Sequence, residues 1–121
     1  MTAAPLVRVR VAVRVAATGT ERDAAIDAWL GTAAASLSRR AIIAEGVLFE
    51  RTTVQGVPLV GLTAGCPCCT GSAALRVTLA RTLRTTRAEA LLLLMATADH
   101  LPLLRRMLES GEMGVRFEVE N

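Results

Sequence analysis

The sequence contains no lysine and no tyrosine, and its only aromatic residues are two phenylalanines and one tryptophan. A protein this poor in aromatic side chains cannot build the stacking platform on which single-stranded nucleic acids bind. All of the positive charge comes from arginine, and the net charge of +3 at pH 7 is modest and spread along the chain. We therefore expect no nucleic-acid partner.

Long apolar segments are also missing. The longest apolar run, residues 88–98, is interrupted by Glu89 and Thr97 and is much shorter than the roughly 20 residues that a membrane-spanning helix needs. Residues 1–5 lack the basic start and apolar block of a signal peptide. We therefore expect a cytoplasmic protein with no membrane partner.

The length and composition indicate one folded domain. A chain of 121 residues is close to the commonest domain size, so residues 1–121 are expected to form a single unit. Apolar residues make up 52% of the chain and charged residues 21%, which excludes a disordered tail.

The clearest periodicity is the alternation of valine or alanine with arginine in residues 7–15, which predicts a strand with one apolar face. Arg8, Arg10 and Arg14 share the other face, and a solvated sheet face is favoured over a row that binds an anion. A capping box at 20–23 predicts a helix over 20–38 with a buried stripe that includes Ile26, Trp29, Leu30, Ala33 and Leu37.

The rest of the chain alternates between strand and helix patterns. Strands are predicted over 40–49, 57–63, 90–96 and 115–119, and helices over 72–87 and 101–110. The strands 40–49 and 57–63 either form a hairpin or lie apart in the sheet. In the helix 72–87, Arg76, Arg84 and Arg87 lie near the apolar stripe. The expected fold is α/β: a small three-layer domain with a largely parallel sheet of about five strands and about three helices.

The three cysteines, Cys66, Cys68 and Cys69, all fall within four residues. In a reducing compartment such a cluster favours metal binding over a structural disulfide. Cys66 and Cys68 face the same way on an extended segment, and Cys69 lies just before a helix whose dipole favours the thiolate. Three thiolates suit Zn²⁺ with one further ligand, or Cu(I) alone. Three inert buried thiols and a redox pair are the weaker alternatives.

The fourth ligand has two candidates. In open α/β sheets, sites gather at the carboxyl ends of the strands. The strand before the cysteines, the strand before Asp99 and His100, and the strand that runs into Glu45 should end at one edge. His100, the only histidine, and Glu45 therefore compete for the fourth position. Asp99 is expected either to lie near the metal or to cap the following helix.

Residues 62–70, with the cysteines at their centre, resemble the N-G-C-x-C-C segment of the CobW-type metallochaperone GTPases. Residues 91–99 are similar to that family's strand ending in E-[TP]-[ST]-G-L-A-D, and residues 42–45 to a strand that supplies a metal-proximal carboxylate in some members. The resemblance covers roughly residues 6–110, although its specific part is the cysteine motif. It implies zinc or cobalt as the metal.

The departures from that family concern nucleotide binding. Where the phosphate-binding loop with its lysine should follow the first strand, the chain reads Ala16-Ala17-Thr18-Gly19-Thr20-Glu21-Arg22-Asp23. We therefore expect a degenerate relative without this loop or the family's C-terminal domain, binding no nucleotide and having no enzymatic activity.

The expected function is a metal carrier, buffer or sensor that binds Zn²⁺, with Cu(I) or Co²⁺ as alternatives, through Cys66, Cys68 and Cys69. Its expected partners are a metal-recipient protein or a second copy of the chain. The alternative is an interaction module, a pseudo-GTPase that docks on a full-length relative or self-associates, with vestigial cysteines.

Overall fold

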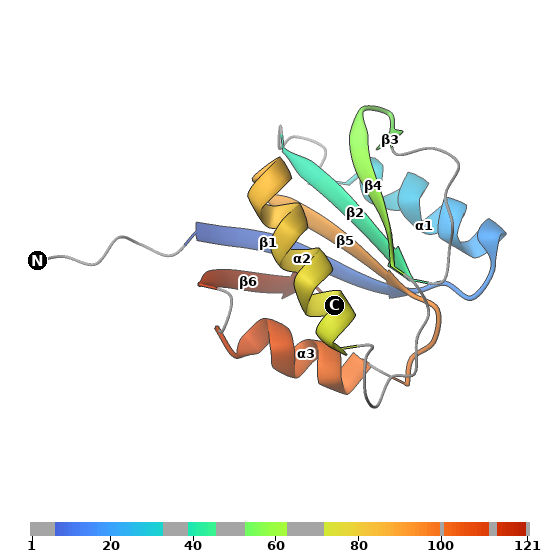
Figure 1. The fold of residues 1–121 in the computed structure, drawn as a ribbon. Coiled ribbons are helices and arrows are strands. Elements are labelled where there is room, and N and C mark those ends of the chain that lie inside the picture. Colours follow the sequence, from blue (N-terminus) through green and yellow to red (C-terminus); the bar gives the residue numbers. More distant parts are fainter. Residues whose placement is uncertain are drawn as a thin grey trace, which may run out of the picture.

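The computed structural model describes residues 7–32, 39–45, 53–62, 72–99, 101–111 and 114–120. They form one sheet with strand order β3-β4-β2-β5-β1-β6, seen in Figure 1. The strands are β1 (Val7–Val15), β2 (Arg40–Glu45), β3 (Thr53–Val54), β4 (Val57–Leu62), β5 (Ala90–Met95) and β6 (Val115–Glu120). The helices are α1 (Gly19–Leu30), α2 (Ser72–Thr86) and α3 (Leu101–Glu109).

Five of the strands are parallel. β5 pairs with both β1 and β2, β4 pairs with the other side of β2, and β6 pairs with the other side of β1. β3 alone is antiparallel and joins β4 through a two-residue turn. Both turn residues, Gln55 and Gly56, have positive φ, 50° and 79°, as the tight turns of hairpins require.

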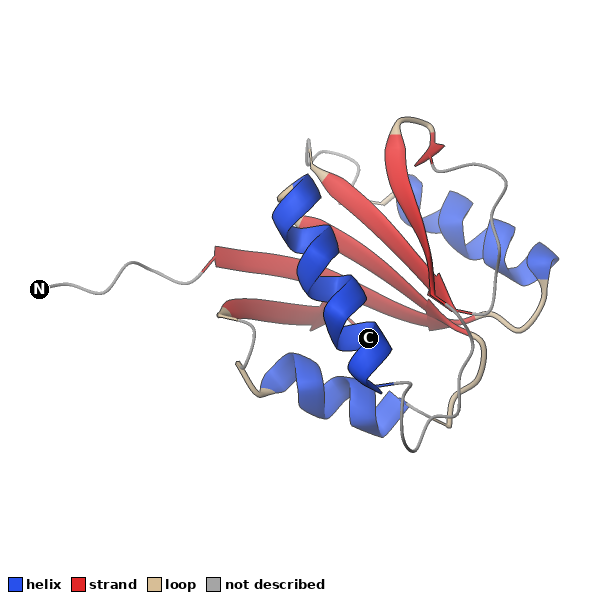
Figure 2. Ribbon diagram, in the orientation of Figure 1, coloured by secondary structure: helices blue, strands red, loops and turns tan. Residues whose placement is uncertain are grey.

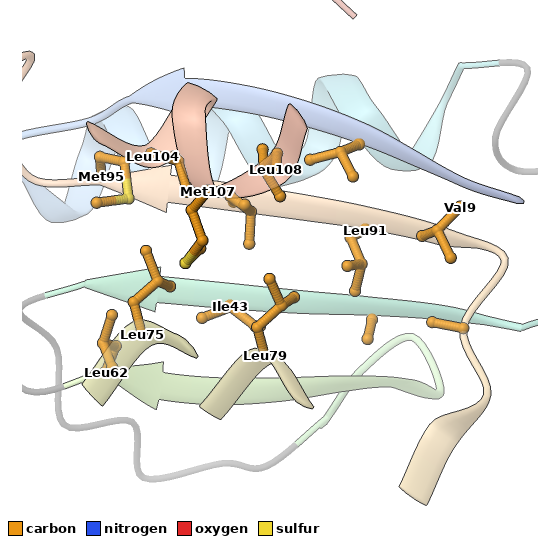
Figure 3. Close-up of a cluster of buried hydrophobic side chains, with 14 residues drawn as sticks. Val9, Ile43, Leu62, Leu75, Leu79, Leu91, Met95, Leu104, Met107 and Leu108 are labelled. Atoms are coloured by element: carbon orange, nitrogen blue, oxygen red, sulfur yellow. The ribbon is translucent and has the colours of Figure 1, made fainter. Parts of the chain in front are cut away.

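Two helices cover one face of the sheet. Leu75 and Leu79 of α2, and Leu104, Met107 and Leu108 of α3, are buried against a row of sheet residues that includes Val9, Ile43 and Leu91. Figure 3 shows these side chains meeting between the two helices and the strands.

α1 covers part of the opposite face. Its Ile26, Trp29 and Leu30 belong to a second cluster with Ile42 and Leu92 of the sheet. Figure 2 shows α2 and α3 in front of the sheet and α1 behind it. All six residues of β5 are buried, because this central strand is covered on both faces, as its continuous apolar run predicts.

The expected fold class is confirmed: the protein is a small α/β domain with helices on both faces of a largely parallel sheet. The sheet has six strands rather than about five, because the short β3 adds one at the edge. The described parts of the expected strands and helices agree with the structure to within a residue or two. The strands expected over 40–49 and 57–63 are parallel neighbours, and the hairpin lies between β3 and β4 instead.

The start of α1 corrects the expected capping box. The N-cap is Thr18 rather than Thr20: the Thr18 Oγ1 accepts a hydrogen bond from the Glu21 N–H at 3.1 Å. The Thr18-Gly19-Thr20-Glu21 segment itself has the spacing of a capping box, so the cap lies two residues earlier than expected and the helix begins one residue earlier, at Gly19. α1 is followed by Gly31, and residues 33–38 of the expected helix lie outside the described residues.

The arginine face of β1 is exposed to solvent. Arg8, Arg10 and Arg14 are all exposed on the side of the sheet that faces α1, because α1 lies over β2 and β5 and leaves the neighbouring part of β1 uncovered. Arg8 lies 3.7 Å from the Glu118 carboxylate of β6. Within the described residues, no helix is long and apolar enough to cross a membrane.

Candidate functional site

The carboxyl ends of three adjacent parallel strands meet at one edge of the sheet. β4 ends at Leu62, β2 ends at Glu45, and β5 ends at Met95. In the ladder between β2 and β4, Glu45 lies directly beside Leu62. The segment that carries the cysteines follows Leu62 in the sequence after only three residues, so Glu45 marks the place where that segment leaves the sheet.

Glu45 is held in position by a neighbouring strand. Its Oε1 accepts a hydrogen bond from the backbone N–H of Ala96 at 3.0 Å, and the residue is half-buried. The second oxygen, Oε2, makes no hydrogen bond with any described residue. A carboxylate fixed through one oxygen keeps the other oxygen available to a metal ion, and such a second contact orients a ligand. Glu45 thus links the ends of β2 and β5.

This edge contains the topological switch point of the sheet. From β1 the chain continues through α1 on one face, whereas from β5 it continues through α3 on the opposite face. β1 and β5 are hydrogen-bonded neighbours up to the Ala16 N–H, which donates to the Met95 carbonyl at 2.9 Å. Ligands of doubly wound sheets bind at the carboxyl ends of the strands beside such a reversal. The strand ends meet at one edge as expected, and a binding site at that edge stays a prediction.

The turn after β1 contains a carboxylate where a phosphate-binding loop would hold a phosphate. Glu21 Oε2 accepts a hydrogen bond from the Ala17 N–H at 2.8 Å, while the Glu21 N–H is bonded to Thr18. One backbone donor of the first turn of α1, the Glu21 N–H, is therefore bonded to the cap, and the Glu21 carboxylate lies near the positive end of the helix dipole. Asp23, the other carboxylate in this segment, is exposed.

The remaining predicted ligands lie outside the described residues. Cys66, Cys68, Cys69 and His100 belong to this group, so their expected convergence stays a prediction. Within the described part of the chain, no cluster of three or more histidine, cysteine, aspartate or glutamate side chains could hold a metal ion.

Asp99 follows β5 and is exposed. Its backbone N–H is bonded to the Thr97 hydroxyl at 3.3 Å, whereas the first N–H of α3, from Leu101, is accepted by the Ala98 carbonyl at 3.1 Å. Among the described residues the Asp99 carboxylate makes no hydrogen bond, so the expected cap on α3 is replaced by a backbone turn. Glu21, Glu45 and Asp99 place carboxylates at this edge of the sheet, where Arg14 and Arg22 also lie.

Sequence reasoning identified Glu45 but missed its partner. The Ala96 N–H is a backbone donor, and no residue type marks a backbone donor in a sequence. The register of β2, β5 and β4 would have been needed to find it. Comparisons of the chain with protein-family models, curated proteins and solved structures gave no match.

Proposed function

We propose that the protein is a non-catalytic binder of a soft transition metal, which acts as a metal carrier, buffer or sensor. The observation that supports it is the meeting of three strand ends at Glu45, which lies beside Leu62 and is hydrogen-bonded to Ala96. The cysteine segment follows one of these strands, and His100 follows another after a short turn. The sequence distances are short enough for both to reach Glu45.

The ligand chemistry favours zinc in the proposed site. Cys66, Cys68 and Cys69 supply three thiolates, and Zn²⁺ completes a tetrahedron with one nitrogen or oxygen ligand. Glu45 or His100 is the fourth ligand in this proposal. Cu(I) is the alternative metal, because it accepts three sulfur ligands without a fourth group, and Co²⁺ would occupy the zinc geometry.

The proposed relationship to CobW-type metallochaperones concerns the metal segment alone. The turn between β1 and α1 has a carboxylate at the helix start, and the chain has no lysine to neutralise a phosphate. In this proposal the protein shares the family's thiolate motif but hydrolyses no nucleotide. The case for metal binding depends on the thiolate chemistry and does not require the relationship.

The proposal is tested by measuring metal content and affinity. Protein purified without a metal-affinity step should contain close to one equivalent of metal by elemental analysis. Titration of the metal-free protein with Co²⁺ should produce the intense near-ultraviolet absorption of cobalt–thiolate bonds. The double variant Cys66→Ser, Cys68→Ser should lose this absorption and most of the zinc, because a neutral hydroxyl is a poor ligand for a soft ion. His100→Ala should lower zinc affinity and leave Cu(I) affinity unchanged if His100 is the fourth ligand.

A folding control separates a carrier site from a structural one. The described core contains no cysteine, so circular dichroism of the protein should survive chelation, unlike that of a zinc finger. If chelation unfolds the protein, the metal is structural and the carrier proposal is wrong. If the double cysteine variant binds the same amount of zinc as the original chain, the cysteines are not ligands. The interaction-module alternative would then replace the proposal.

A further inference from the structure

A pocket of about 900 Å³ opens at the amino-terminal edge of the sheet, the edge opposite the candidate metal site. It lies between α2, the strands β1 and β6, and the residues just before β2 and β5. The described residues that line it are Val9, Arg39, Arg76, Ala80, Leu83, Arg84, Arg87, Ala88, Glu89 and Val115. Its volume is within the range of about 300–1,000 Å³ that small-molecule sites occupy.

The floor of this pocket is apolar. Val9 and Ala88 are buried, and Leu83 and Val115 are half-buried at its surface. Ala80 contributes only a methyl group from α2, which leaves room between the helix and the strands. An apolar floor of this kind gains free energy when it is covered by a hydrocarbon group.

The described rim of the pocket is positively charged. Glu89, the one carboxylate among the described lining residues, is already paired, because Arg39 Nη2 and Nε both donate to Glu89 Oε1, at 2.8 and 3.1 Å. The guanidinium groups of Arg84 and Arg87 are exposed and make no hydrogen bond or ion pair with any described residue. Two arginines with no acidic partner among the described residues therefore line an apolar surface.

Arg87 also has an unusual backbone. It follows the last turn of α2 with φ of 51°, and its N–H donates to the Leu83 carbonyl at 2.9 Å. This is the left-handed position after a helix that glycine fills most easily. An arginine there strains the backbone, and strained residues of this kind concentrate at functional sites. Arg87 thus combines a strained backbone with a guanidinium group at the pocket that has no partner among the described residues.

We propose that the pocket binds an organic anion with an apolar body, of the class of medium-chain fatty carboxylates. Arg84 and Arg87 hold the carboxylate, and the hydrocarbon chain covers the floor at Val9, Leu83 and Val115. A nucleotide fits less well, because none of the described lining residues is aromatic and could stack on a base. An inorganic anion would leave the apolar floor uncovered.

The probe for this proposal is decanoate, titrated by calorimetry below its micellar concentration. Decanoate should bind with one equivalent per chain, and octanoate should bind about tenfold more weakly, because each buried methylene adds roughly three- to fourfold in affinity. Decanol tests the need for the charge, and inorganic phosphate tests the need for the chain. Both should bind at least about tenfold more weakly than decanoate.

Arg87→Gly is the decisive variant. Glycine relieves the positive φ, so the melting temperature should stay the same or rise, while decanoate affinity should fall about tenfold or more. Arg84→Ala should weaken binding similarly. Arg81→Ala is the matched control, because Arg81 is an exposed arginine of α2 that does not line the pocket, and it should bind like the original chain. Ala80→Phe should block binding by filling the pocket.

Several results would overturn the proposal. One is decanoate affinity that falls equally in the Arg81, Arg84 and Arg87 variants, which would mean a diffuse attraction to basic α2. Another is equal binding of decanol and decanoate, which would mean an apolar cleft without a charge requirement. Phosphate binding as tight as decanoate binding would mean a plain anion site. The absence of decanoate binding at millimolar concentration would also exclude the proposal.

Discussion

Replacement of Glu45 separates its structural role from its proposed role as a metal ligand. Glu45 Oε1 accepts a hydrogen bond from the backbone N–H of Ala96, a half-buried residue, at an N···O distance of 3.0 Å. Glu45→Ala removes the acceptor and should cost about 1–3 kcal/mol of unfolding free energy, which is the usual effect of an unpaired buried donor. Glu45→Gln keeps an oxygen acceptor in the same place, so this variant should lose less than about 1 kcal/mol of unfolding free energy.

The same two variants should behave alike towards zinc. A carboxamide is a poor replacement for a carboxylate ligand, so Glu45→Gln and Glu45→Ala should both weaken zinc binding by at least about tenfold. Loss of a residue that only hydrogen-bonds to a metal ligand already has an effect of this size. Urea denaturation of the metal-free protein measures the first effect, and competition with a chromogenic chelator measures the second. Asp23→Asn, an exposed acid on α1, is the matched control and should change neither.

Two outcomes would refute this reasoning. If Glu45→Ala is as stable as the original chain, the hydrogen bond to Ala96 does not contribute to stability as argued. If Glu45→Gln binds zinc with unchanged affinity, Glu45 is a structural residue and the fourth ligand has to be sought at His100. A combined Glu45→Gln, His100→Ala variant would then lose affinity only through the histidine.

Two further predictions concern the core and the first turn of α1. Leu92 is fully buried in β5, so Leu92→Ala should lower the free energy of unfolding by about 2–5 kcal/mol in urea denaturation. Val77→Ala, on the exposed face of α2, should change it by no more than about 0.5 kcal/mol. Equal losses in the two variants would contradict the assigned core. Calorimetry with Mg²⁺–GTP or Mg²⁺–ATP should detect no binding, because the Glu21 carboxylate lies in the turn between β1 and α1 and the chain has no lysine to neutralise a phosphate. Micromolar affinity that disappears in Arg22→Ala would contradict this expectation.

The parts of the fold that the sequence predicts best are those with long, regular patterns. The alternation in 7–15 and the apolar run in 90–96 each correspond to a strand that differs from the expectation by at most one residue. β3 was missed because a strand of two residues, Thr53–Val54, has no measurable period. Its existence depends on the turn at Gln55 and Gly56, where both residues adopt positive φ.

The neighbours of each strand could not be predicted with the same success. Residues 40–45 and 57–62 carry apolar patterns that suit either a hairpin or separate strands, and only long-range pairing decides that they are parallel neighbours. Likewise, the alternation in β1 predicts that one face of the strand is polar, but not which part of the fold leaves that face exposed to solvent. That face is open because α1 lies over β2 and β5, a placement that depends on the whole crossover.

The candidate sites differ in how much of each a sequence can reveal. Clustered cysteines are typical of metal binding, so the proposed metal-binding segment can be predicted from residue type and spacing alone. The pocket on the opposite edge takes its lining from α2, from β1 and β6, and from the residues just before β2 and β5, and no local sequence pattern joins these. Helical spacing predicts that Arg84 and Arg87 lie near the apolar stripe of their helix, but the positive φ of Arg87 is a property of the folded backbone.

The placement of the two proposed sites follows from the parallel sheet. The five parallel strands all run in the same direction, so strand ends with Glu45 and Asp99 gather at one edge, and strand starts with Arg39 and Glu89 gather at the other. A strand of six residues such as β2 spans roughly 20 Å. That is about twice the screening length at physiological ionic strength, so charge at one edge acts only weakly on the other. Carboxylates that suit a metal ion at one edge and arginines that suit an organic anion at the other can therefore coexist in one small domain without opposing each other.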